Sequence, residues 1–325
     1  MNAPQKIAGF TLGLVVVFAA AFGVGATLGP DGAATADSTQ AHDSMSGVGQ
    51  DAAGEEKNAP ADELPGGLMS TENGYTLELA QTRVNAAKNV PLRFKITDSA
   101  GRPQTQYQVN HDKQLHLILV RRDMVGFQHV HPVLDDKGTW SVPVDLSRAG
   151  DYRVFADFVP AGGENLTLGA DLGVAGPYDP QPLPVADTST SVDGYIVTLS
   201  GSPKAIEASM LTLSVSRAGK PVTNLQPYLG AYGHLVALRS SDLAYLHVHP
   251  MGEPGDGTTA AGPDIGFHTT VPSNGNYRLF LDFKHDGVVR TAEFTVSVGP
   301  ADSGKPAAPA STGTAPEPAP AGHGH

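Results

Sequence analysis

Apolar and polar residues alternate along most of the chain, which is the spacing of β-strands and not of helices. Between positions 152 and 158, one face of a strand would carry the apolar set Tyr152, Val154, Ala156 and Phe158. The opposite face would carry Arg153, Phe155 and Asp157. The same alternation predicts seven strands in the first half of the chain, at 75–80, 91–97, 115–121, 127–131, 140–146, 152–158 and 166–174. It predicts seven more in the second half, at 194–200, 209–215, 233–239, 244–249, 265–271, 276–283 and 289–298.

These two groups of seven strands belong to two copies of one domain. Residues 116–132, HLILVRRDMVGFQHVHP, align without a gap with residues 234–250, HLVALRSSDLAYLHVHP. A second shared motif, G-x-Y-R-x-F-x-D-F, occupies 150–158 and 275–283. About seven short strands in roughly a hundred residues are typical of a β-sandwich. The chain is therefore predicted to be all-β, with two tandem immunoglobulin-like or cupredoxin-like sandwiches at 68–176 and 192–299.

Four segments outside the repeats have their own character. Residues 1–30 contain an uncharged apolar run, 7–29, which is long enough to cross a bilayer as a helix. A single-pass anchor that leaves the C-terminal domains outside the cytoplasm is one interpretation, and a signal peptide cleaved near Ala36 is the other. Residues 31–67 form an acidic spacer, 177–191 a Pro-rich linker and 300–325 a Pro/Ala-rich tail, and the spacer and tail are predicted to be disordered.

Charge and composition narrow the functional classes. The 21 Lys and Arg residues against 33 Asp and Glu residues give a formal net charge of −12, which argues against a nucleic-acid partner. There are no cysteines, so disulfides, thiolate metal sites and cysteine nucleophiles are excluded. The sequence contains no nucleophile elbow, phosphate-binding loop or dinucleotide fingerprint, and we expect no enzyme.

Three histidines recur at the same spacing in each copy, and a hairpin would bring them together. The copies carry His116, His129 and His131, and His234, His247 and His249, respectively. Residues two apart on a strand share a face. A turn centred on 123–124 places His116 opposite His131, and a turn centred on 241–242 places His234 opposite His249.

Three neutral imidazoles without a thiolate suit Zn²⁺ or Cu²⁺. We therefore predict one metal site per copy, formed by His116, His129 and His131 and by His234, His247 and His249. Asp157 and Asp282 are possible additional ligands, since they also occur in both copies. Further possible donors occur in one copy only: His111, Asp112, His268, His285 and Met251. The alternative is structural: apolar residues such as Ile118 and Val236 share the histidine face, so the imidazoles can instead form a buried hydrogen-bonded cluster.

With these motifs in view, the sequence resembles a family of membrane-anchored, exported proteins from high-GC Gram-positive bacteria. The resemblance covers roughly 74–298 and rests on the paired HVHP hairpins and the G-x-Y-R-x-F-x-D-F strand. It implies location and architecture, with no established activity. The chain is also similar in outline to exported copper-resistance sandwich proteins, but it departs from them in having an apolar N-terminal run and no Met-rich loop.

These observations lead to two functional hypotheses. The first is an extracytoplasmic protein that binds and handles copper or zinc through one three-histidine site per repeat. The second is a non-enzymatic interaction or scaffold protein of the cell surface whose histidines are structural. Convergence of the ring nitrogens on one point would favour the first hypothesis.

Overall fold

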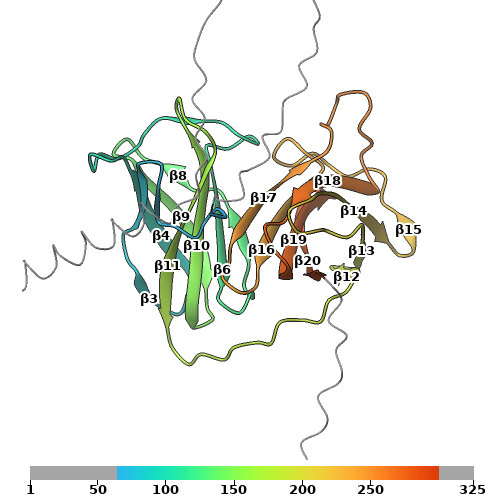
Figure 1. Ribbon diagram of the computed structural model, residues 1–325, viewed down its shortest axis with the longest axis horizontal. Coiled ribbons are helices and arrows are strands. Elements are labelled where there is room, and N and C mark those ends of the chain that lie inside the picture. Colours follow the sequence, from blue (N-terminus) through green and yellow to red (C-terminus); the bar gives the residue numbers. More distant parts are fainter. Residues whose placement is uncertain (1–63, 300–325) are drawn as a thin grey trace, which may run out of the picture. The chain divides into compact units, whose positions relative to one another are not determined.

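The computed structural model describes residues 64–299, apart from the side chains of His247 and His249, and these residues form strands joined by loops and turns (Figure 1). Residues 64–299 contain no helix that could cross a membrane. The predicted anchor at 7–29, the possible cleavage near Ala36, most of the acidic spacer and the whole tail at 300–325 lie outside the described residues. The prediction of two tandem all-β domains is confirmed.

The first repeat consists of two sheets that enclose an apolar core. One sheet has the order β1-β2-β4-β9-β8. Its strands are Thr71–Glu72, Tyr75–Leu79, Ala87–Thr97, Thr139–Leu146 and Val133–Leu134. The other has the order β3-β11-β10-β6-β7, with β5 (Tyr107–Gln108) pairing at β10. Its strands are Arg83–Asn85, Leu166–Ala175, Gly150–Pro160, Leu115–Arg121 and Gln128–Val130. Strand β3 runs parallel to β11, while the other ladders of this repeat are antiparallel.

The second repeat has equivalent strands, but its two sheets are joined into one. The continuous order is β12-β13-β14-β18-β17-β16-β19-β20, with β15 pairing at β14. The strands are Ser189–Val192, Tyr195–Ser200, Ala208–Arg217, Lys220–Pro221, Gly233–Arg239, Tyr245–Pro250, Asp264–Thr270, Gly275–His285 and Val288–Val298, in chain order. Pairing of β17 with β18 at His249 and Pro250 makes the junction.

Alternation along the strands correctly predicted which side chains fill each sandwich. Tyr152, Val154, Ala156 and Phe158 lie in the core of the first repeat. The matching residues Tyr277, Leu279, Leu281 and Phe283 lie in the core of the second. The sequence did not predict the short strands β1, β3, β5, β8, β12 and β15, because two to four residues are too few for an alternating pattern to be recognised.

A third apolar cluster joins the two repeats, which belong to one compact unit. It is formed by the opposite faces of the same strands and contains Ile118, Val120, Met124, Phe155, Val236, Leu238, Leu243, Tyr245 and Phe280, with Phe127 and Leu183 at its edge. Phe127 stacks on Phe280 with ring centroids 3.9 Å apart and planes 5° apart. The face that carries the histidines is therefore buried against the other repeat and not inside its own sandwich.

The chain enters the first repeat along this boundary. The Tyr245 N–H donates to the Gly66 carbonyl at 2.9 Å, and the Gly67 N–H donates to the Thr167 carbonyl at 2.8 Å. Gly67 has φ +74°, and a β-carbon there would collide with the Phe155 ring. A larger residue at this position would push the entering segment away from the boundary.

Candidate metal centre

The predicted hairpin register is observed in both repeats. Leu117 pairs with Val130 and Ile118 with His129, so the next pair along the ladder is His116 and His131. In the second repeat Leu235 pairs with Val248, which places His249 opposite His234. Both loops are longer than a two-residue turn. In the first repeat the Arg121 N–H donates to the Val125 carbonyl at 3.0 Å, and in the second the Arg239 N–H donates to the Ala244 carbonyl at 3.0 Å. A four-residue loop with the same centre leaves the register unchanged, and Leu243 at φ +64° accommodates it.

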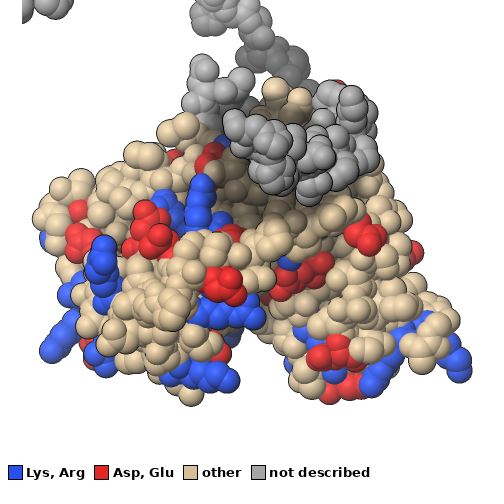
Figure 2. Space-filling view, turned by 90° about the horizontal axis from the view of Figure 1, so that it is seen from below, with Lys and Arg blue, Asp and Glu red and all other residues tan. Residues whose placement is uncertain are grey.

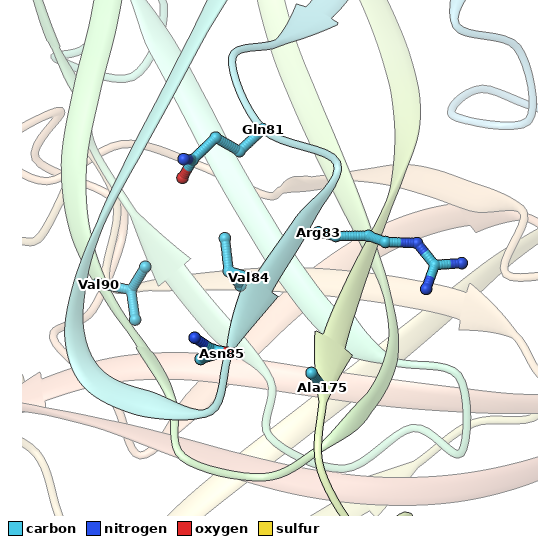
Figure 3. Close-up of a pocket in the computed structure, with 6 residues that line it drawn as sticks. All are labelled: Gln81, Arg83, Val84, Asn85, Val90 and Ala175. Atoms are coloured by element: carbon cyan, nitrogen blue, oxygen red, sulfur yellow. The ribbon is translucent and has the colours of Figure 1, made fainter.

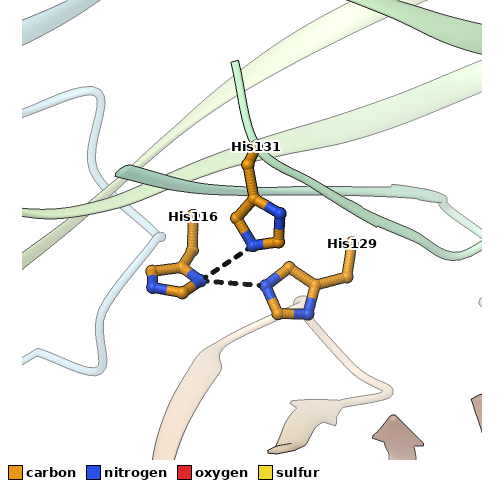
Figure 4. A group of neighbouring side chains, drawn as sticks. All are labelled: His116, His129 and His131. Carbon is orange, nitrogen blue, oxygen red and sulfur yellow. Dashed lines mark hydrogen bonds between the residues drawn. The ribbon is translucent and has the colours of Figure 1, made fainter. Parts of the chain in front are cut away.

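In the first repeat the hairpin brings His116, His129 and His131 together, and one ring nitrogen from each lies within 4.8 Å of the others (Figure 4). His116 Nδ1 is 3.1 Å from His129 Nε2 and 3.2 Å from His131 Nε2. Two ligands that are each about 2.0–2.1 Å from a tetrahedral Zn²⁺ stand about 3.3–3.4 Å apart. The spacing of these nitrogens is therefore close to that of a loaded site.

The outer hydrogen bonds set which nitrogens carry lone pairs. His116 Nε2–H donates to the Asn110 carbonyl at 3.0 Å. His129 Nδ1–H donates to Asp282 Oδ2 at 2.7 Å. Because the Asn110 carbonyl only accepts, a neutral His116 carries its lone pair on Nδ1, the atom that faces His129 Nε2 and His131 Nε2. An N–H of either neighbour can donate to this lone pair, and a metal ion can take the place of that proton.

Burial keeps two of the three imidazoles neutral. It lowers the pKa of His116 to about 4, with the neighbouring His129 as the next cause. Burial likewise lowers the pKa of His131 to about 3, followed by the effects of His129 and His116. Both imidazoles are thus neutral at pH 7, which is the state that binds a metal ion.

The two predicted aspartates lie around the histidines rather than among the converging nitrogens. Asp282, 3% exposed, comes from the second repeat and holds His129 of the first, while its other oxygen accepts from the Thr291 hydroxyl at 2.6 Å. Such carboxylate–histidine pairs orient metal ligands and raise their basicity. Asp157 is opposite His116 across β6 and β10 and accepts hydrogen bonds from Asn165 and Thr167.

The second histidine set is described only in part. His234, 8% exposed, donates Nε2–H to the carbonyls of Tyr228 and Leu229 at 2.9 and 3.0 Å. Burial lowers its pKa to about 4, with His111 as the next cause. His247 and His249 occupy the expected positions of β17, but the positions of their side chains lie outside the described part of the molecule.

His111 and Tyr228 also belong to this region. The sequence offered His111 only as a donor present in one copy, and it did not indicate Tyr228. The His111 ring lies edge-on to His234 with centroids 5.2 Å apart, and it is 6.3 Å from His116. Tyr228 is 6.4 Å from His131 and 6.0 Å from His234, and burial raises its pKa to about 12. Because His111 aligns with Leu229, the repeat alignment gave no signal for it.

Other surface features offer less chemistry. An open pocket where β3 lies beside β11 is lined by Gln81, Arg83, Val84, Asn85, Val90 and Ala175 (Figure 3). Only Arg83 is charged among these six residues, so the pocket brings no acid and base together. On the face drawn in Figure 2, acidic and basic side chains are interspersed and form no continuous basic surface.

Comparison with known proteins identifies a family but no activity. A family model described as "Domain of unknown function (DUF8832)" matches the chain twice, at 70–175 and 190–300. No curated protein matches the sequence.

Solved structures that align with the chain do so only weakly. They include the Escherichia coli adhesin FdeC (15% identity, TM-score 0.22), which aligns over 71% of this chain and 65% of its own. Yersinia pseudotuberculosis InvD (12%, 0.24) aligns over 70% and 59%. A putative membrane anchored protein from Corynebacterium diphtheriae (11%, 0.21) aligns over 70% and 60%. The chain therefore spans less than two thirds of each of these three structures.

Proposed function

We propose that this chain, which belongs to the DUF8832 family, binds a transition-metal ion, Cu²⁺ or Zn²⁺, between its two repeats. His116 Nδ1, His129 Nε2 and His131 Nε2 would be the ligands. The observation that carries the proposal is the convergence of one ring nitrogen from each of the three histidines within 4.8 Å, while the other nitrogens of His116 and His129 are held by the Asn110 carbonyl and by Asp282.

The donor set favours these two ions over others. Imidazole suits Zn²⁺ and Cu²⁺, whereas Mg²⁺ and Ca²⁺ prefer oxygen ligands, and the three converging atoms are all nitrogens. Raw affinity for such a site rises to a maximum at Cu²⁺. Three protein ligands also leave a coordination position for water or for a ligand that accepts the ion.

The finer proposal is extracytoplasmic metal handling, by buffering, delivery or resistance, with one site per repeat. The repeat alignment supports the second site, at His234, His247 and His249. The apolar run at 7–29 supports attachment to the cell membrane with the repeats outside the cytoplasm. The proposal includes a non-enzymatic role, in which the histidines bind and release an ion and transform no substrate.

The alternative is a cell-surface interaction or scaffold protein whose histidines hold the repeats together. The contact between His129 and Asp282 favours it, because that contact links the two repeats directly. Under this hypothesis the imidazoles would contribute to docking of the domains and would show no selective affinity for metal.

Calorimetric titration of the metal-free, full-length chain with Cu²⁺ and then Zn²⁺ at pH 7 separates the two hypotheses. Both proteins compared would carry His323→Ala and His325→Ala, which remove the histidines of the tail. We expect about two equivalents to bind, one per triad, and tight binding to disappear in His129→Ala/His247→Ala.

A matched control is His285→Gln, which removes a buried imidazole of the second repeat that contacts Tyr195 and Asn224 instead of the cluster. It should bind metal like the parent chain. Binding that is the same with and without His129 and His247 would overturn the metal proposal and leave the scaffold hypothesis.

A further inference from the structure

We infer that His234 of the second repeat and His111 of the first hold a second divalent metal ion beside the first, so that the two ions form a paired centre across the boundary. This inference rests on the proposed function. It goes beyond one separate site per repeat, because it predicts two neighbouring ions and an additional ligand that the repeated motif does not contain.

The first argument is the equivalence of His116 and His234. Each stands directly opposite an aspartate on the neighbouring strand, Asp157 and Asp282 respectively. Each also donates Nε2–H to the carbonyl of the residue six positions earlier, Asn110 or Tyr228. In both neutral rings, therefore, Nδ1 carries the lone pair. If His116 Nδ1 is a metal ligand, His234 Nδ1 is equally prepared to be one.

The second argument is the distance between these two rings. Their centroids lie 6.5 Å apart and their planes differ by 27°. His129 of the first set is also 6.5 Å from His234. Because a bound ion lies about 3 Å from the centroid of its ligand ring, two ions held by these rings would be within about 13 Å of each other. At that distance the spins of two copper ions interact.

The third argument is the placement of His111. This residue lies in the turn closed by Asn110 and Lys113, and its ring is 5.2 Å from His234 and 6.3 Å from His116. Its counterpart in the second repeat is Leu229, and both residues have positive φ, +48° and +55°. The first repeat thus has an imidazole at a position where the second repeat has an apolar side chain. That imidazole lies beside His234 of the second repeat.

This arrangement parallels the observed role of Asp282, which crosses from the second repeat to orient His129 of the first. The first ion would depend on an aspartate of the second repeat, and the second ion on a histidine of the first. The ligand class is a pair of divalent transition-metal ions, for which copper provides the sharpest readout.

The test uses the full-length chain with His323→Ala and His325→Ala, loaded with Cu²⁺ and freed of excess metal. Bound copper is measured by elemental analysis, and the spins by electron paramagnetic resonance. We expect two Cu²⁺ per chain with dipolar broadening, since both ions lie within about 13 Å of each other. His234→Ala should retain one copper with the spectrum of an isolated ion.

His111→Leu places in the first repeat the residue that occupies this position in the second, where leucine tolerates the same backbone conformation. This variant should keep the first copper. Its affinity for the second copper should fall on the order of tenfold or more, which is the size of effect that loss of a group supporting a metal site has on metal affinity. The His285→Gln control should keep both ions and their coupling, and thermal unfolding verifies that each variant is folded.

Each result has a defined meaning. Two coppers without spin coupling, or a parent chain that binds only one copper and is unaffected by His234→Ala, would overturn the paired centre while leaving the proposed metal-binding function intact. An unchanged second copper in His111→Leu would overturn the role of His111. Copper binding that survives in His129→Ala/His247→Ala would overturn the proposed function itself.

Discussion

The two faces of strands β10 and β19 are both buried, yet they differ in chemistry. The inward face of each strand is apolar and fills its own sandwich. The outward face mixes aromatic residues, Phe155 and Phe280, with the carboxylates Asp157 and Asp282. A sandwich is complete when one face of each sheet is covered, so the outward face is normally left to solvent and polar residues. Here a second copy of the same domain covers it.

This difference shows how duplication can create a site. When two copies of one domain pack through the same face, the ionisable side chains on that face of one copy lie against the equivalent face of the other copy. A group that is tolerated beside water becomes buried and must find a partner. The His129–Asp282 contact is one such partnership, and the histidine cluster lies along the same boundary.

The largest expected effect comes from shortening one aromatic residue on each face. Phe158→Ala opens a cavity inside the first sandwich and should cost about 3–5 kcal/mol of unfolding free energy. Phe280→Ala should cost a similar amount but should also weaken metal binding, because Phe280 stacks on Phe127 near the histidine hairpin. Denaturant unfolding and metal titration of both variants make the comparison. Equal loss of metal affinity in both would show that the boundary has no special role.

Acid should destabilise the metal-free chain through the boundary histidines. The pKa of His116 is lowered from 6.5 to about 4 in the folded protein, so the unfolded chain binds more protons between these values. This contribution to stability is complete above pH 6.5 and is lost as the pH falls, by on the order of 3 kcal/mol at pH 4. Denaturant midpoints measured from pH 7 to pH 4 check the sign, and His116→Ala should show a shallower slope.

Replacing one carboxylate on each side of the boundary tests which of the two carboxylates supports metal binding. Asp282→Asn removes the charge that holds His129 and should lower the affinity of the first site by about 10–100-fold. Asp157→Asn is the matched comparison, because Asp157 is equally buried, lies opposite His116 and accepts hydrogen bonds from Asn165 and Thr167. Competition titration with a metal chelator gives both affinities. If Asp282→Asn has the affinity of the parent, the carboxylate does not support the ligand.

The smallest effect is expected at the exposed rim of the boundary. Arg122 donates to the Ser241 carbonyl at 2.7 Å, between the hairpin loops of the two repeats. Because water can replace this partner, Arg122→Ala should change the unfolding free energy by less than about 1 kcal/mol. Metal affinity should stay the same. A larger loss in denaturant unfolding would mean that the rim contributes as much as the apolar centre.

Much of the fold could be predicted because its signals are local. Alternation within the strand at 152–158 places Val154 and Phe155 on opposite faces. Val154 lies in the core of the sandwich and Phe155 lies at the boundary between the repeats. The gap-free spacing of His116, His129 and His131 determined the hairpin register, since a ladder with period two permits few alternatives. The short strands could not be predicted, because they have too few residues to show an alternating pattern.

The sequence by itself determined the duplication, the all-β class and the set of histidines that a hairpin gathers. Only the tertiary structure decided what lies beyond them. It assigned Asp282 as the partner of His129, 153 positions earlier in the chain, and it placed His111 against His234. The physical reason is that pairing within a strand or hairpin follows from spacing along the chain. Which outward faces meet depends instead on the apolar area that two folded domains can bury against each other.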